Sequence, residues 1–220
     1  MKRGLLQLLR PVFFLTMLLG ALWITTASLV YFDPEELAPF VIEKLPVRFE
    51  SLWQSSLQVH VTSALITFPL CLVLMTRFVQ RHKAWHRWLG RAAGLLVVGA
   101  LVPSGVILSF EAKGGWPVTV GFLLSGGIVF CGMIGGVISA RRRQLSSHAR
   151  AMRHVIAQMS VAVTSRALLV AFDRFGVAPD TAYVVALWVP VLASAFLAEV
   201  VSGPFRFSGL VFNYFNRSLS

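Results

Sequence analysis

Charged residues are scarce in this chain: they make up 13% of its 220 positions, and only nine of them are acidic. A soluble domain carries about a quarter charged residues, so a single soluble core is excluded. Hydrophobic residues make up 56% of the sequence. They form runs that reach or approach the ~20 residues with which a helix crosses a bilayer. Because these runs are continuous rather than alternating, they predict helices and not a barrel of strands. The expected fold is all-α, a polytopic membrane protein built as a helical bundle.

Cysteine is almost absent as well, and the two present, Cys71 and Cys131, both lie inside apolar runs. They are typical of small buried residues and do not indicate a disulfide framework. The sequence has no Walker loop, dinucleotide fingerprint, CxxC, HExxH or GxSxG motif, so nucleotide binding, hydrolysis and zinc chemistry have no support. No catalytic residue and no metal site can be named, and a non-enzymatic role is favoured.

Six transmembrane helices are predicted from the apolar runs, at about residues 11–32, 55–77, 89–110, 117–140, 152–173 and 181–203. The first run follows a basic start, as in a signal peptide, but it is longer than a signal core, so we expect it to be retained. The whole chain, 1–220, is then one integral membrane domain. Its extracytoplasmic segment, at about 33–54, is expected to form a short helix lying on the bilayer, with Phe40, Val41 and Trp53 toward the headgroups.

Opposite charges gather on opposite sides of the six predicted spans, although the formal net charge is +11. If the N-terminus is cytoplasmic, the basic runs at 77–91 and 141–153 are cytoplasmic too, and every acidic residue except Glu199 lies outside. Lys and Arg favour the cytoplasmic side, so both termini are predicted to be inside. This distribution indicates a multi-pass membrane protein that contacts the lipid bilayer, and it gives no sign of a nucleic-acid partner.

Glycine is concentrated in the third and fourth spans. Gly90 and Gly94 in one span, and Gly132 and Gly136 in the other, have the four-residue spacing that lets helices approach closely. We therefore expect these two spans to pack tightly as an antiparallel hairpin.

The stretch HKAWHRWLGR, residues 82–91, places two histidines where the third span begins. Its tryptophans and arginines are those of an ordinary helix entry at the membrane interface. A b-type haem with two axial histidines needs them on facing helices at one depth. His86 at the third span and His148 or His154 at the fifth meet this condition, so one haem on the cytoplasmic side is an alternative. A second haem is excluded, because His60 has no opposing histidine in the outer half.

Three further ionisable residues lie at membrane depth, namely His60, Arg166 and Glu199, and such residues are candidates for function. His60 and Arg166 reach nearly the same depth, so His60 can accept a hydrogen bond from the guanidinium. Alternatively, His60 bonds to a carbonyl of a neighbouring helix, and Arg166 extends to the outer interface.

Glu199 lies at the depth of basic residues on two other spans, which predicts a structural ion pair across the bundle. A carboxylate that carries protons is the alternative. The basic residues concerned are Arg91, Arg153 and His154.

The order of these features resembles a bacterial family of predicted membrane proteins called domain of unknown function 2306. The resemblance covers roughly residues 55–203 and rests on the motif HRWLGR, from His86 to Arg91, and on HARAM, from His148 to Met152, with the glycine-rich spans between them. Its other matching positions are His60, Pro69, Arg166 and Glu199.

The resemblance implies a multi-span fold in the inner membrane of a bacterium, but no reaction. It raises His60, His86 and His148 above His82 and His154 as functional residues, and it leaves His86 and His148 as the haem pair. Two positions depart from the family pattern. Ala151 stands where an aromatic residue is usual, and His154 is a histidine where another residue is expected.

Three functions remain open from the sequence. The first is a membrane assembly or scaffold role, in which the polar residues only hold helices together. The second is an electron-transfer bundle with one haem b on His86 and His148. The third is a small proton-coupled transporter, with His60 and Arg166 lining a polar pocket and Glu199 on the exit path. Six spans are few for an alternating-access carrier, so the transporter would act as a homo-oligomer.

Overall fold

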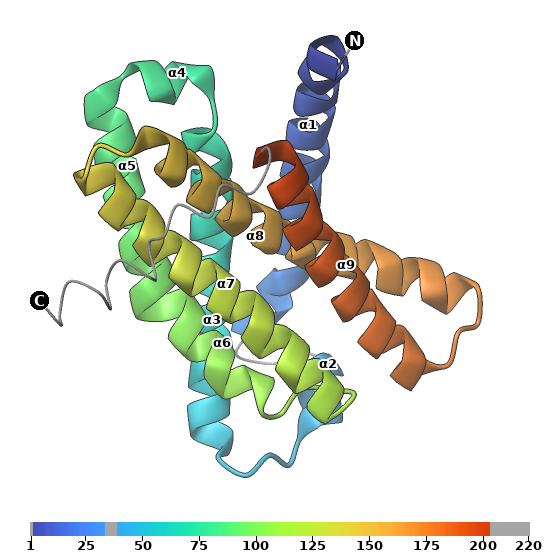
Figure 1. Cartoon of the computed structure of the whole chain (residues 1–220). Helices are drawn as coiled ribbons and strands as arrows, with labels where there is room; N and C mark the ends of the chain where they lie inside the picture. The colour runs from blue at the N-terminus through green and yellow to red at the C-terminus, as the bar shows by residue number, and fades with distance from the viewer. Residues whose placement is uncertain (1, 34–38, 203–220) are drawn as a thin grey trace, which may run out of the picture.

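The computed structural model of the chain describes residues 2–33 and 39–202, and within them all regular structure is helical (Figure 1). Six helical segments are long and apolar enough to cross a membrane. They are Pro11–Phe32, Glu50–Leu74, Lys83–Ser109, Trp116–Arg141, Leu145–Arg174 and Pro179–Ser202. Each of the six predicted spans corresponds to one of these segments, with the second, third and fifth beginning several residues earlier than the sequence indicated.

The first half of the chain consists of α1 (Lys2–Ser28), the 3-10 turn η1 (Leu29–Phe32), α2 (Pro39–Lys44), α3 (Glu50–Leu74) and α4 (Arg77–Arg81). The remaining elements are α5 (Lys83–Leu96), the π-helix η2 (Val97–Leu101), α6 (Val102–Ser109), α7 (Trp116–Arg141), α8 (Leu145–Arg174) and α9 (Pro179–Ser202).

The third span is not a single regular α-helix, because α5, η2 and α6 follow one another without a break. Pro103 lies in the first turn of α6 and has no N–H group to continue the α-helical hydrogen bonds. The π-helical turn directly before it is the usual way in which a helix adjusts at such a point. The irregular backbone thus lies in the middle of the span, where it can accept hydrogen bonds from another helix.

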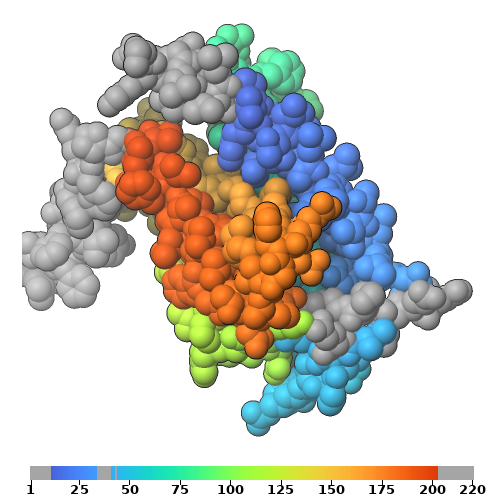
Figure 2. All heavy atoms as spheres, turned by 90° about the vertical axis from the view of Figure 1, so that its right-hand side faces the viewer, coloured from blue at the N-terminus to red at the C-terminus, as the bar shows by residue number. Residues whose placement is uncertain are grey.

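The longest helix, α8, lies at the centre of the packing. It packs most extensively on α7 and α9, and it also contacts α1 and α3. Figure 2 shows the end of α8 between α9 and α1 on one face of the molecule. The main hydrophobic core joins α1, α3, α5, η2, α7 and α8 through side chains such as Met17, Leu72, Val97, Met133 and Val155.

Basic loops gather at one end of the bundle, which we call the basic end. It carries α4 and the connection between α7 and α8, that is, residues 77–81 and 141–144, and it lies toward the top of Figure 1. The connections from α6 to α7 and from α8 to α9 lie at the opposite end. Which end faces the cytoplasm stays a prediction from the charges.

Glycines on α7 allow its close contact with α8. A Cβ atom at Gly132 would lie 3.0 Å from Val155 Cγ2 and 3.4 Å from the carbonyl oxygen of Ala151. At Gly136 it would lie 2.3 Å from Met152 Cε. A side chain at Gly132 would therefore push the two helices apart, whereas one at Gly136 would first displace the flexible end of Met152.

The prediction that both glycine pairs join the third and fourth spans was only partly right. Helices α6 and α7 do pack against each other, and a Cβ at Gly94 would contact Met133 Sδ at 3.8 Å. Gly90, however, has no neighbour within 4 Å of its Cβ position. Gly132 and Gly136 face the fifth span instead, because the rotation of α7 about its axis is set by packing that the spacing alone does not reveal.

The segment between α1 and α3 also differs from expectation. Val41 and Trp53 are buried, with 6% and 4% of their surface exposed, instead of lying toward the headgroups. They form a small hydrophobic cluster whose other members are Tyr31, Leu45, Val47, Leu57 and Leu108. The side chain of Phe40 and residues 34–38 lie outside the described residues. Burial against the protein removes more apolar surface from water than a position at the interface would.

We predict that Gly132→Leu destabilises the protein by about 1–3 kcal/mol, because the new side chain overpacks the contact between α7 and α8. The matched control is Gly127→Leu on the same helix, where a Cβ has nothing within 4 Å. Thermal unfolding in detergent measures both variants. A Gly132→Leu protein as stable as the Gly127→Leu protein would contradict the packing described.

Candidate functional site

Three polar residues of α8 lie four positions apart, at Arg150, His154 and Gln158. Residues at this spacing share one face of a helix. Their hydrogen bonds reach Glu199, Val191 and Ser194, all on α9. We call these three residues the polar stripe of α8. The stripe runs from the basic end into the interior of the bundle.

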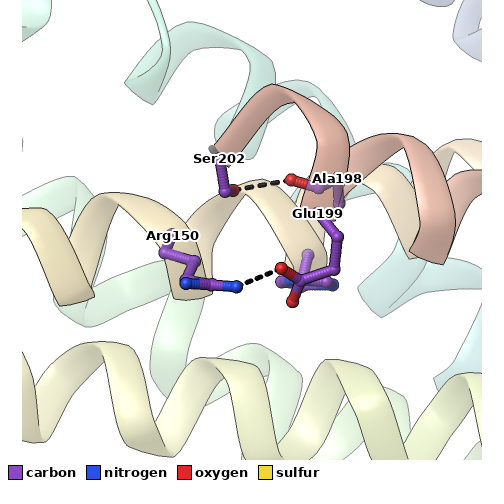
Figure 3. A network of polar contacts seen from close by, with 5 residues as sticks. Arg150, Ala198, Glu199 and Ser202 are labelled. Atoms are coloured by element: carbon purple, nitrogen blue, oxygen red, sulfur yellow. Dashed lines mark hydrogen bonds and ion pairs between the residues drawn. The ribbon is translucent and has the colours of Figure 1, made fainter. Parts of the chain in front are cut away.

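Glu199 lies at the outer part of the stripe, near the end of α9. Its carboxylate accepts hydrogen bonds from Arg150 Nη2 and, at 2.8 Å, from His154 Nε2, as Figure 3 shows for the arginine. All three side chains are partly buried, with 19–33% of their surface exposed. The predicted ion pair of Glu199 is thus present, and His154 is one of its expected partners. Its other partner is Arg150, which the sequence did not indicate.

Gln158 lies deeper along the stripe and is almost fully buried, with 2% of its surface exposed. Its Nε2 donates to the carbonyl of Val191 and to Ser194 Oγ, each at 3.0 Å, and its Oε1 accepts from Ser125 Oγ of α7 at 2.9 Å. One amide therefore links α7, α8 and α9. A buried amide without such partners would destabilise the fold.

His60 of α3 is hydrogen-bonded to the third span. Its Nδ1 donates to the carbonyl of Leu101 at 3.0 Å, and Leu101 is the last residue of the π-helix. A Cβ at Gly105 would lie 3.0 Å from His60 Cε1, so the glycine makes room for the ring. This arrangement is the alternative in which His60 bonds to a carbonyl of a neighbouring helix.

Arg166 does not pair with His60. Its side chain is exposed on the surface of α8, and its Nη1 donates to the carbonyl of Ala162 at 3.0 Å, one turn earlier on the same helix. The guanidinium bonds to its own helix, while the imidazole bonds to the third span. Of the two alternatives left open by the sequence, the structure therefore does not show the hydrogen bond between His60 and Arg166.

His86 and His148 come together at the basic end, as the sequence predicted for facing helices at one depth. Their ring centroids are 6.2 Å apart, and the ring planes make an angle of 88°. His148 Nδ1 donates to the carbonyl of Gly136 at 2.9 Å, whereas His86 Nδ1 is buried without a hydrogen-bond partner among the described residues. His82 is exposed, and its Nδ1 donates to the carbonyl of Phe78 at 2.8 Å, within the α4 turn.

Within the described residues, no three His, Cys, Asp or Glu side chains come close enough together to hold a metal ion. A pocket of about 220 Å³ lies at the end opposite the basic end, lined by Phe110, Gly115, Trp116 and Thr119. None of the site residues named from the sequence lines it.

The sequence analysis missed Gln158, together with Ser125 and Ser194, because uncharged side chains inside an apolar run do not stand out. A signal was present, since Gln158 continues the four-residue spacing of Arg150 and His154. Such a spacing indicates a polar face on one side of a membrane helix, and that face must be covered by another helix.

These features define a helical membrane protein with six candidate spans, held together by polar contacts between its helices. The chain belongs to the family described as predicted membrane protein (DUF2306), which matches residues 57–202. The matched region begins in α3 and ends with α9, so it includes His60, the polar stripe and Glu199, whereas α1 lies outside it. No curated protein and no solved structure matches the chain.

We predict that Gln158→Leu lowers the free energy of unfolding by about 1–2 kcal/mol, because three interhelical hydrogen bonds, each worth about 0.6 kcal/mol in a membrane, are lost. Gln80→Leu is the matched control, because Gln80 is exposed and its amide donates to the carbonyls of Leu74 and Met75 at the nearby end of α3. Unfolding in mixed micelles measures the difference. Equal stability of the two variants would contradict the role given to the Gln158 amide.

Proposed function

We propose that this protein is an integral scaffold of the bacterial inner membrane, which serves the assembly or positioning of other membrane proteins and carries out no reaction itself. The observation that supports the proposal is the use of its intramembrane polar groups. His60, Gln158 and Glu199 are hydrogen-bonded to neighbouring helices, and Arg166 is bonded to its own helix. Polar groups used in this way stabilise a helical bundle by joining its helices.

The proposal includes the location and orientation inferred from the charges. Both termini are cytoplasmic, and the basic end faces the cytoplasm, because Lys and Arg are enriched there. The lipid bilayer covers the exposed apolar side chains of the six spans, among them Leu95, Phe196 and Val200, each at least 59% exposed. A homo-oligomer is compatible with this surface but is not required by the scaffold role.

A transporter has less support from the same contacts. It would need His60 and Arg166 at a common polar pocket, but each has its hydrogen bond elsewhere. It would also need Glu199 to change partners during transport. In the structure this carboxylate has two basic partners, which favour its charged form and hold it in place.

The test replaces the ion pair by apolar side chains of similar length, in the double variant Arg150→Met/Glu199→Met. Replacing such a pair together is often neutral for stability, whereas removing one partner is not. We expect the double variant to fold, and to restore the membrane complexes of a strain lacking the gene as fully as the wild type does. Native gels of solubilised membranes and growth of the strain are the measurements.

The matched control is the single variant Glu199→Met, which leaves Arg150 and His154 without their acid and is expected to accumulate to a lower level. If the double variant folds like the wild type but restores nothing, the carboxylate has a chemical role and the scaffold proposal is wrong.

A further inference from the structure

The contact between His86 and His148 is not explained by a scaffold role. The two residues lie in the first turns of α5 and α8, and both are partly buried at the basic end. An edge-to-face contact of two rings contributes to packing, but it does not supply hydrogen-bond partners for the ring nitrogens. Where such rings share a partly buried position, a common ligand is a direct physical reason for the arrangement.

Each ring has one nitrogen for which the described part of the chain shows no hydrogen-bond partner. His148 donates through Nδ1 to the carbonyl of Gly136, which fixes the tautomer and leaves the lone pair on Nε2. A histidine that ligates a metal almost always has its other nitrogen held in this way. His86 has a buried Nδ1 without a partner among the described residues. A buried nitrogen of this kind costs free energy unless a ligand binds that nitrogen.

The separation of the rings fits two ligands of one metal ion. A metal–nitrogen distance of about 2 Å on each side, with about 1.1 Å from each nitrogen to its ring centre, places the two centres about 6 Å apart. The observed separation is 6.2 Å. The angle of 88° between the rings is also compatible, since each imidazole can rotate about its own metal–nitrogen bond.

We propose that His86 and His148 are the two axial ligands of one haem iron at the basic end of the bundle. The number of further ligands that the protein can supply distinguishes haem iron from other metal ions. No third His, Cys, Asp or Glu joins the pair within the described residues, so a zinc ion, which takes four protein ligands in structural sites, has too few. Haem iron needs only two ligands from the protein, because the porphyrin supplies four.

The test is the absorption spectrum of the protein, expressed in haem-replete cells and purified in mild detergent. We expect a Soret band from about one haem per chain and the low-spin spectrum of a six-coordinate iron with two imidazoles. His86→Ala and His148→Ala should each lower the bound haem at least about tenfold, because loss of a ligand exceeds the usual effect of losing an outer-shell partner. His82→Ala is the matched control, since His82 lies four residues before His86 and is exposed, and it should keep the full band.

Imidazole added to the His86→Ala and His148→Ala proteins separates loss of a ligand from misfolding. We expect it to restore the low-spin spectrum in samples that stay monodisperse on size exclusion. A wild-type protein without a Soret band overturns the proposal, whether or not metal analysis finds copper in the sample. Equal haem content in the His86→Ala, His148→Ala and His82→Ala proteins overturns it as well. The scaffold proposal is tested through Arg150 and Glu199 and does not depend on this result.

Discussion

A polar group inside a bilayer must find a partner within the protein, because the hydrocarbon offers none. In this protein that constraint is met mainly by one helix. The polar stripe of α8 bonds to α9 through Glu199 and through the amide of Gln158, and the same amide reaches Ser125 of α7. These contacts fix the register of α9 along α8. They also explain why the longest helix of the bundle lies at its centre.

Close packing and polar bonding act on different faces of the same helices. Gly132 and Gly136 let α7 approach α8, and Gly121 makes room for Leu187 of α9. A Cβ at Gly20 would lie 2.3 Å from Val163 Cγ1, so α1 meets α8 at a glycine too. Lipid gives no hydrophobic reason for helices to associate, and close contact at small residues supplies dispersion energy instead. The glycines therefore bring the helices into contact, and the polar side chains select which faces meet.

The six spans could be predicted from the sequence, because continuous apolar runs of sufficient length have few other stable conformations in a membrane protein. The ion pair of Glu199 was also predictable, since a lone acid at the depth of several bases has a clear electrostatic preference. From the sequence, a bond from His60 to a backbone carbonyl could be named only as one of two alternatives, and its acceptor, Leu101, could not be named. The acceptor is at a π-helical turn, and its exposure depends on how the third span adjusts at Pro103.

Depth predicted that His86 meets His148 or His154 of the fifth span, and the resemblance to the family selected His148. The structure brings the rings of His86 and His148 together. Arg166 illustrates the opposite case. Its expected depth in the membrane suggested His60 as a partner. The partner of Arg166 depends, however, on the side of α8 from which its side chain projects. The depth of a residue does not reveal on which side of its helix it lies. For the same reason, Gly132 and Gly136 were expected to contact the third span, whereas they contact the fifth.

The most direct test of the polar contacts is a double-mutant cycle on Arg150 and Glu199, measured as free energies of unfolding in mixed micelles. The single variants Arg150→Met and Glu199→Met and the double variant complete the cycle with the wild type. A direct contact predicts a coupling of about 1 kcal/mol. The free energy of unfolding then falls less in the double variant than the sum of its decreases in the two single variants. Losses that add to within about 0.3 kcal/mol would mean that the two side chains do not interact, and the register of α9 along α8 would be contradicted.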